Sequence, residues 1–432
     1  MPDITLKERI DMADKKPVFT EKEVLEYHLG GKIGLGLLKP LKDQKDLSMA
    51  YTPGVSLVCE EIQRDSEKAR IYTAKRNLVA VITDGTAVLG LGNIGPKASI
   101  PVMEGKAVLF KAFADVDGWP LPLEGVLNEK GTTDTEKFID TVLKVSCMFG
   151  GINLEDIAAP ACFEIEDKLD ELLDIPVFHD DQWGTAIITL AALKNYCVIS
   201  GKKIGEIKVV INGAGAAGLR IADMIKADGV KNCVICDSKG VLSDARGDLN
   251  KFKMRHSVSS APATLREVMK GADVFIGVSA AGCVDEEMVI SMGENPAIFA
   301  MANPVPEILP EKVQKCMKGR SYVMATGRSD YPNQINNVLG FPFIFRGALD
   351  VMASKITMGM KVAASRALAE LARQGNVPES VKKAYGRDFE FGSDYLIPTP
   401  FDPRIRSWES RAVAEAAVKD GVARSTELPS YV

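Results

Sequence analysis

The sequence lacks an apolar run that approaches the about 20 residues needed to cross a membrane. Residues 1–16 alternate charges without an apolar core, so no signal peptide is visible. The net charge of −5 is mild, which argues against nucleic acid or an anionic membrane as the main partner. Low-complexity tracts are also missing. With 432 residues, of which 46% are hydrophobic, the chain is expected to form a globular protein of two domains.

Cysteine is present but without the spacing of a secreted, disulfide-rich protein, because the eight cysteines are scattered. Cys233 and Cys236 form a C-x-x-C pattern inside an apolar run that we expect to be a strand. Three-residue spacing in a strand sends the two side chains to opposite faces, which argues against a shared zinc ion or a dithiol. We therefore expect reduced thiols and a cytoplasmic location.

Short apolar runs and helical patterns alternate along the chain, which predicts an α/β fold with a parallel, doubly wound sheet. We expect an N-terminal mixed α/β domain over residues 1–184. A Rossmann-like domain is expected over residues 185–432, and it ends in C-terminal helices. The strands expected in the two domains are 78–83, 176–178, 208–211, 233–236, 274–277, 298–301 and 322–325.

The pattern G-x-G-x-x-G occurs twice, and only its second copy has the context of a dinucleotide site. Gly90, Gly92 and Gly95 form the first copy, and Pro96 and Pro101 follow it, so we expect no long helix there. The second copy follows the strand 208–211 and opens a helix, as a pyrophosphate-binding loop requires. Its residues are Gly213, Ala214, Gly215, Ala216, Ala217 and Gly218.

Asp237 lies at the end of the next strand, where an acidic residue can accept hydrogen bonds from an adenine ribose diol. That arrangement favours NAD. Ser238 and Lys239 lie beside it and could instead hold a 2′-phosphate, which favours NADP. Both coenzymes therefore stay open.

Acidic residues gather upstream of the second glycine loop, at the ends of apolar segments. Glu155 and Asp156 follow one such segment, and Asp181 follows another. Clustered carboxylates suit a hard divalent cation, Mg²⁺ or Mn²⁺, better than zinc. Together with the glycine loop, they indicate metal-assisted redox chemistry on a small, oxygen-rich substrate.

Seven motifs, in order along most of the chain, resemble those of malic enzyme, most closely its compact bacterial branch and the form fused to a phosphotransacetylase-like domain. They are Tyr51–Val55 (YTPGV), Thr83–Gly92 (TDGTAVLGLG), Pro101–Lys106 (PVMEGK), Asn153–Asp156 (NLED), His179–Gln182 (HDDQ), Ala302–Pro304 (ANP) and Asn336–Val338 (NNV). The resemblance implies oxidative decarboxylation of L-malate to pyruvate and CO₂ with reduction of NAD(P)⁺. It also implies a divalent metal and a homo-oligomer, a dimer or larger.

The resemblance assigns roles to particular side chains. Lys106 would be the general base for the C2 hydroxyl, which requires a lowered pKa. Asp180 would support this base, and Tyr51 would protonate the enol at C3. The remaining assignments are the metal ligands Glu155, Asp156 and Asp181, and the substrate and nicotinamide contacts Asn303 and Asn337.

One position departs from the family pattern. Larger malic enzymes carry an acidic residue and then an arginine after the Asp-Gly motif, and that arginine binds a substrate carboxylate. Thr86 and Ala87 occupy these positions here, so the C4 carboxylate needs another partner, for which we favour Arg328.

Two other functions remain open at this point. A metal-independent amino-acid dehydrogenase also places a catalytic domain before a Rossmann domain, and a chelator would leave its activity intact. A non-catalytic nucleotide or metabolite sensor could share the fold, since fold alone does not fix function. Such a sensor should have lost the proton-transfer or metal residues, which are all present in this sequence.

Overall fold

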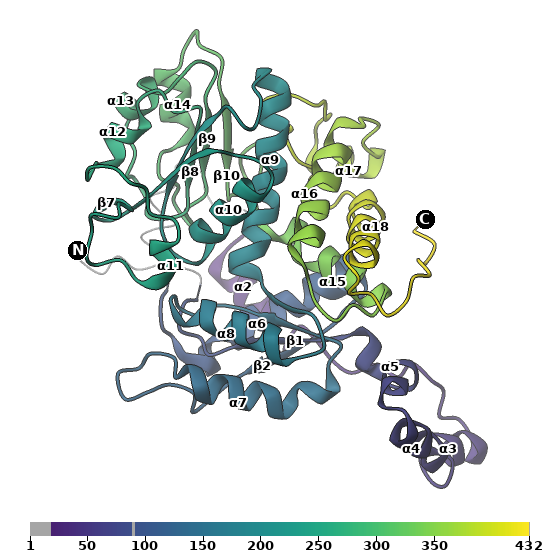
Figure 1. The fold of residues 1–432 in the computed structure, drawn as a ribbon. Helices are drawn as coiled ribbons and strands as arrows, with labels where there is room; N and C mark the ends of the chain where they lie inside the picture. The colour runs from purple at the N-terminus through teal and green to yellow at the C-terminus, as the bar shows by residue number, and fades with distance from the viewer. Residues whose placement is uncertain (1–18, 89–90, 432) are drawn as a thin grey trace.

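The computed structural model describes residues 19–88 and 91–431, so Gly90 of the first glycine pattern lies outside the described residues. Figure 1 shows two α/β bodies, one built on β1–β4 and one on β5–β10, with the C-terminal helices beside them. The expected α/β class and Rossmann-like second sheet are confirmed. In the described part of the chain, no helix combines the length and apolarity that crossing a bilayer would require.

The first sheet has four parallel strands in the order β2-β1-β3-β4. Its strands are β1 (Leu78–Thr83), β2 (Asp117–Pro122), β3 (Gly151–Leu154) and β4 (Val177–His179). The surrounding helices are α6 (Gly95–Ala114), α7 (Thr135–Val145) and α8 (Ala161–Leu172), with short 3₁₀ turns at η1 (Ser66–Lys68), η2 (Ala74–Asn77) and η3 (Ser146–Met148). The carboxyl ends of all four strands therefore meet at one edge of this sheet.

Helix α6 contradicts the expectation that no long helix follows the first glycine pattern. It begins at Gly95 and runs for 20 residues. Pro96 lies in the first turn, where the backbone N–H has no helical partner in any case. Pro101 lies inside the helix, on an exposed position where water can solvate the carbonyl it leaves unpaired. The strand β1 and this helix therefore form a β–loop–α unit, and Lys106 lies on the helix.

The second sheet has the order β10-β9-β8-β5-β6-β7 and is parallel except for β7. Its strands are β5 (Lys208–Asn212), β6 (Asn232–Asp237), β7 (Gly240–Val241), β8 (Val274–Gly277), β9 (Ala297–Ala300) and β10 (Val323–Thr326). The helices are α9 (Thr185–Ser200), α10 (Ala216–Ala227), α11 (Lys251–Met254), α12 (Leu265–Met269), α13 (Glu286–Ile290) and α14 (Pro310–Cys316). The strand order reverses between β5 and β8, so the loop after β5 lies at the switch point where nucleotides bind in such sheets.

Four helices come from the end of the chain, and the first of them completes the core of the first sheet. They are α15 (Phe341–Asp350), α16 (Met358–Arg373), α17 (Glu379–Tyr385) and α18 (Arg404–Lys419). The ring of Phe110 on α6 lies 4.8 Å from that of Phe341 and 5.4 Å from that of Phe345. The chain therefore passes to the second sheet and returns, and α15 buries its aromatic face against the first body.

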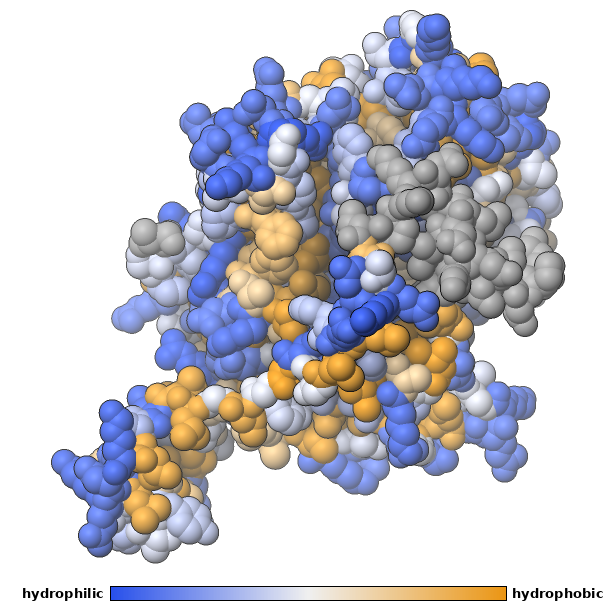
Figure 2. Space-filling model, turned by 180° about the vertical axis from the view of Figure 1, so that it is seen from behind, coloured by the Kyte–Doolittle hydropathy of each residue, from blue (hydrophilic) through white to orange (hydrophobic). Residues whose placement is uncertain are grey.

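The segment before β1 packs differently from the rest of the chain. It contains α2 (Glu21–His28), α3 (Gln44–Ala50), α4 (Val55–Arg64) and α5 (Ala69–Tyr72). Figure 1 shows α3 and α4 as a lobe that projects beyond the first body. No residue of α2, α3 or α4 is buried. Figure 2 shows hydrophobic surface on this projecting lobe.

Candidate active site

Three carboxylates meet at the carboxyl edge of the first sheet. Glu155 and Asp156 follow β3, and Asp181 lies in the single π-helical turn η4 (Asp180–Gly184) that follows β4. One ligand oxygen from each of the three residues lies within 4.8 Å of the others. The backbone N–H of Asp156 donates to Asp181 Oδ2 at 2.9 Å, which fixes the two loops together. The structure thus brings together the three residues expected to bind metal.

The chemistry of this donor set fits a hard divalent cation. All three side chains offer oxygen, which Mg²⁺ and Mn²⁺ prefer. Glu155 and Asp156 are buried, and burial raises the pKa of Glu155 well above its usual value. Such crowding of acids is unfavourable unless positive charge offsets it. Asp181 is partly exposed, so a cation could reach the cluster from solvent.

Lys106 is the one ammonium in contact with this cluster among the described residues. It forms ion pairs with Asp180 and, at 3.1 Å, with Glu155 Oε1. Its Nζ also lies 4.4 Å from the centre of the Phe341 ring. Burial lowers the pKa of Lys106, but the carboxylates of Asp180, Glu155 and Asp181 outweigh it and hold the pKa above its usual value.

This direction is opposite to the lowered pKa that a general base needs. The carboxylates that raise the pKa include two expected metal ligands, Glu155 and Asp181. A cation bound to them would withdraw their negative charge from Lys106 and add positive charge nearby. The arrangement therefore couples the protonation of Lys106 to occupation of the carboxylate cluster.

Asp180 and Asn337 form the other side of the lysine site. Asn337 lies in the turn η5 (Asn337–Leu339), and its Nδ2 donates to Asp180 Oδ2 at 2.6 Å. Gly184 packs directly against this pair: an added Cβ would lie 1.9 Å from Asp180 Oδ1. The chain leaves the first body through η4 and returns through η5, so two distant segments hold the carboxylate that contacts Lys106.

A buried group of charged residues supports η4 from behind, and the sequence patterns did not reveal it. Arg220 Nε donates to Gln182 Oε1 at 2.8 Å. The Nζ of Lys361 lies 3.5 Å from the centre of the Trp183 ring, and burial lowers the pKa of Lys361 to about 8. Glu166 on α8 faces both cations. These residues come from separate helices, so no local spacing could indicate their contact.

The second glycine loop has the geometry of a dinucleotide site. It joins β5 to α10, as expected. Gly213 has a φ of 123°, a conformation that favours glycine. A Cβ on Gly218 would lie 1.8 Å from the carbonyl oxygen of Gly213, so the loop closes only with glycine there. A cavity of about 650 Å³ opens beside the loop and reaches Asp237 and Lys239.

Asp237 is surrounded by cations in this cavity. It accepts hydrogen bonds from Arg246 (2.8 and 3.1 Å), from Lys253 Nζ (2.8 Å) and from the backbone N–H of Lys239 (2.9 Å). Burial opposes its ionisation, but the bonds from Arg246 and Lys253 lower the pKa of Asp237 to about 2. Asp248 pairs with the outer side of Arg246. Arg246 and Lys253 were not identified from the sequence.

Asn303 and Arg328 follow neighbouring strands, β9 and β10. Asn303 is exposed. The guanidinium of Arg328 forms two bonds of 2.8 Å to Asp330, and its Nη1 donates to the carbonyl of Pro304 at 3.1 Å. Arg328 would therefore have to exchange an internal carboxylate for that of a substrate.

The fold does not place Tyr51 close to Lys106. It follows α3 on the projecting lobe, and it is 71% exposed. Figure 1 shows that lobe extending away from β1 and α6. The expected general acid and general base thus lie apart in this structure.

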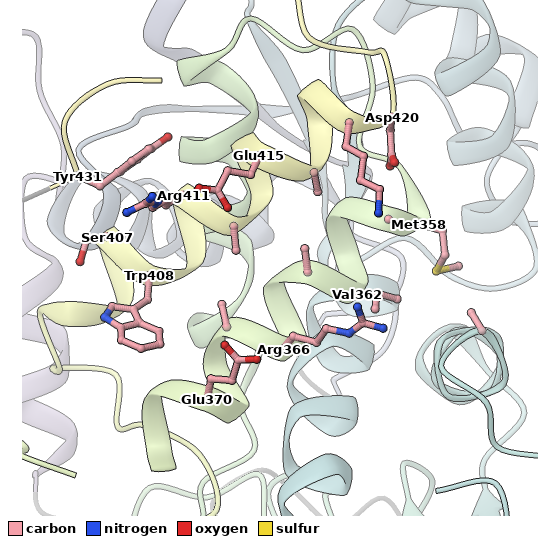
Figure 3. A pocket seen from close by; sticks show the side chains of 17 residues that line it. Met358, Val362, Arg366, Glu370, Ser407, Trp408, Arg411, Glu415, Asp420 and Tyr431 are labelled. Carbon is pink, nitrogen blue, oxygen red and sulfur yellow. Dashed lines mark hydrogen bonds and ion pairs between the residues drawn. The ribbon is translucent and has the colours of Figure 1, made fainter. Parts of the chain in front are cut away.

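A larger cavity, of about 840 Å³, lies between α16 and α18 and is separate from this site. Figure 3 shows Arg366 and Glu370 on one helix and Trp408, Arg411 and Glu415 on the other. None of the site residues expected from the sequence lines it. The chemistry described above therefore belongs to the carboxylate edge and the glycine loop.

Comparison with protein families finds a match for each half of the chain. Residues 31–170 match the family model "Malic enzyme, N-terminal domain", and residues 183–382 match "Malic enzyme, NAD binding domain". An NADP-dependent malic enzyme of Halomonas elongata is 50% identical, and the match covers 93% of this chain and 94% of that protein. A probable NADP-dependent malic enzyme of Rickettsia prowazekii is 53% identical over 93% of this chain.

These relatives differ in their total length. The chain spans 52% of the Rickettsia protein and 56% of an NADP-dependent malic enzyme of Rhizobium meliloti, which is 51% identical. Among solved structures, a malic enzyme from Pyrococcus horikoshii matches with a TM-score of 0.85 and 42% identity, over 94% of this chain and 92% of that one. By its sequence and its fold, the chain belongs to the malic enzyme family.

Proposed function

We propose that this chain catalyses the oxidative decarboxylation of L-malate to pyruvate and CO₂ with reduction of NAD(P)⁺. The observation that carries the proposal is the placement of Lys106 between Asp180 and Glu155, at the border of a three-carboxylate cluster. The glycine loop with its adjoining cavity supports the redox half of the reaction. The names of the relatives agree with it.

The side chains divide the proton transfers between them. A cation held by Glu155, Asp156 and Asp181 supplies polarisation of the C2 oxygen when bound, and the dinucleotide supplies a hydride acceptor. Lys106 takes the proton of the C2 hydroxyl as the hydride leaves C2. Asp180 holds the Nζ of Lys106 in place, and Asn337 in turn donates to Asp180. The C3–C4 bond then breaks and CO₂ leaves.

Tyr51 completes the reaction by giving its hydroxyl proton to C3 of the enol of pyruvate. Asn303 and Asn337 remain our candidates for contacts to substrate and nicotinamide. Arg328 remains our candidate for the C4 carboxylate, in exchange for Asp330.

The cations around Asp237 favour NADP⁺ as the coenzyme. Lys239, Arg246 and Lys253 gather there against two carboxylates, those of Asp237 and Asp248. Asp237 already accepts bonds from two of these cations, which competes with acceptance from a ribose diol. A 2′-phosphate would add the negative charge that this group can still accommodate. The Halomonas relative is named NADP-dependent, although one from Geobacillus stearothermophilus is named NAD-dependent.

Steady-state assays test the proposal directly. L-malate is offered with NADP⁺ and with NAD⁺, each with Mn²⁺ and with EDTA. We expect turnover only with Mn²⁺, and a higher kcat/KM with NADP⁺. Turnover of an amino acid that survives EDTA would favour the metal-independent dehydrogenase instead. Binding of a nucleotide without turnover of any substrate would favour a sensor.

A further inference from the structure

The side chain of Arg220 connects the coenzyme side of the molecule to the carboxylate cluster. Arg220 lies on α10, two positions after Gly218 of the glycine loop. This helix packs directly on η4, the turn that carries Asp181, and the Arg220 side chain between them is only 11% exposed. One buried side chain therefore joins the helix whose N-terminus is the expected pyrophosphate site to the turn that holds an expected metal ligand.

Two contacts fix the guanidinium of Arg220 against η4. Its Nε donates to Gln182 Oε1 at 2.8 Å, and Gln182 follows Asp181 directly in the chain. Its Cζ lies 4.7 Å from the centre of the Trp183 ring, which is a cation–π distance. Gln182 and Trp183 are both buried. The turn therefore cannot shift relative to α10 without the loss of at least one of these contacts.

Three acids hold Arg220 in this orientation. Asp223 lies about one helical turn further along α10 and accepts from Nη1 at 3.3 Å. Glu166 and Asp167 on α8 accept from Nη2 at 3.5 and 3.2 Å. Glu166 also accepts from the backbone N–H of His179, the last residue of β4, at 3.0 Å. The guanidinium thus contacts groups of both bodies, and its planar set of donors suits several fixed acceptors better than an ammonium would.

Lys361 supports the same turn from a different direction. It lies on α16, and its Nζ is 3.5 Å from the centre of the Trp183 ring. Lys361 is buried, as Arg220 is largely buried, and Glu166 faces both cations. The two cations therefore have a similar contact with η4, but Arg220 belongs to the helix that the glycine loop opens and Lys361 does not.

We propose that Arg220 is a positioning residue that couples binding of the coenzyme to binding of the divalent cation. A dinucleotide at the glycine loop fixes the start of α10, and Arg220 carries this restraint to η4. The Asp181 carboxylate is then held beside Glu155 and Asp156. Since the turn has to be ordered only once for two ligands, each ligand binds more tightly when the other is present. The identity of the two ligands rests on the proposed function.

Binding measurements without L-malate test this coupling. The Kd of Mn²⁺ for the full chain is measured by electron paramagnetic resonance, with and without saturating NADP⁺. We expect NADP⁺ to lower this Kd about tenfold in wild type, and by about twofold or less in Arg220→Met. Direct attraction between the cation and the coenzyme phosphates is the same in both proteins, so the difference between the two ratios reports on Arg220. Arg220→Lys should resemble Arg220→Met, because an ammonium cannot reproduce the planar set of donors.

Lys361→Met is the matched control, because it removes a buried cation from the same Trp183 ring. We expect the ratio of its two Kd values to stay at about tenfold, as in wild type. If Arg220→Met does not fold, Gln182→Met takes its place, since it removes the acceptor on η4 and leaves Arg220 paired with its acids. We expect the ratio to fall in Gln182→Met as well.

An equal ratio in wild type and in the folded Arg220 or Gln182 variant would overturn the coupling. A loss of the same size in Lys361→Met would also overturn it, because it would show a general weakening of η4. So would a wild type that binds both ligands independently. If wild type shows the expected coupling but does not turn over L-malate, the coupling stands and the proposed function fails. A wild type that binds neither ligand contradicts both.

Discussion

Replacing Gly184 by alanine should lower the activity of this protein strongly while lowering its stability only a little. Gly184 is buried at the end of η4. A Cβ there would lie 1.9 Å from Asp180 Oδ1 and 3.0 Å from Asn337 Cβ. Since Cβ atoms do not approach other heavy atoms more closely than 3.0 Å, the Asp180 carboxylate must move by about 1 Å. The clash falls on the end of a side chain, so the backbone can stay in place.

The displaced carboxylate is the one that contacts Lys106 and accepts from Asn337 at 2.6 Å. A misplacement of about 1 Å near reacting groups can cost about 10²-fold in rate. Overpacking of a buried site costs about 1–3 kcal/mol of folding free energy. For a chain of this length such a loss lowers Tm by only a few degrees. We therefore expect kcat to fall about 100-fold in a protein that remains folded at assay temperature.

The assay compares kcat for L-malate with Mn²⁺ and NADP⁺, alongside thermal unfolding of each variant. Gly340→Ala is the matched control, since its added Cβ would lie 3.6 Å from the Gly184 carbonyl oxygen and from Ile187 Cγ2, which is ordinary contact. We expect this control to keep most of the wild-type kcat. Wild-type kcat in Gly184→Ala, or an equal loss in both variants, would refute the claim that Asp180 must hold its present position.

Three other substitutions test separate parts of the structure. Lys106→Ala should abolish turnover and leave NADP⁺ affinity nearly unchanged by calorimetry; normal turnover would remove it as the base. Gly218→Ala forces a Cβ to 1.8 Å from the Gly213 carbonyl, so NADP⁺ affinity should fall at least about tenfold while Mn²⁺ affinity stays. Glu409 is fully buried, and neither of its oxygens has a hydrogen-bond partner among the described residues. Burial raises its pKa well above 4.5, so the stability linked to its proton is present below about pH 4.5 and is lost as pH rises. Glu409→Gln should raise the free energy of unfolding, and with it Tm, much more at pH 8 than at pH 5, since each unit of pKa shift corresponds to about 1.4 kcal/mol. The exposed Glu415→Gln should change Tm at neither pH, and a Tm gain of Glu409→Gln that is equal at both pH values would contradict this.

Local patterns predicted the second half of the fold well. The strands expected at 208–211, 233–236, 274–277, 298–301 and 322–325 are β5, β6, β8, β9 and β10, each within one residue at either end. Buried parallel strands are short, apolar and bounded by turns, so composition alone marks them.

The first half was harder because its elements contain residues that local rules assign to loops. Strand β2 includes Gly118, Pro120 and Pro122, and it forms at the edge of the sheet, where a missing N–H is tolerated. Helix α6 was rejected because of Pro96 and Pro101, yet one lies in the first turn and the other faces solvent. In both elements, the position of the proline in the tertiary structure decides how much it destabilises the element.

The candidate site, too, could be predicted only where neighbouring positions in the sequence show it. Carboxylates that follow apolar strands predicted a cluster, and Glu155, Asp156 and Asp181 do lie together. Trp183 and Lys361 meet across nearly 180 positions of sequence, and only the folded chain brings them into contact. The exposed position of Tyr51 was also invisible, since the motif that contains it does not show that α3 lies on a projecting lobe.

The two passages of the chain between the sheets, η4 and η5, also have a mechanical consequence. Asp180 lies in one passage and Asn337 in the other, and a hydrogen bond joins them across the gap. Any rotation of the second body about η4 and η5 must strain or lengthen the hydrogen bond between Asn337 and Asp180. A change in the relative position of the two bodies at these segments would therefore alter the counter-ion of Lys106 directly, with no other residue between them.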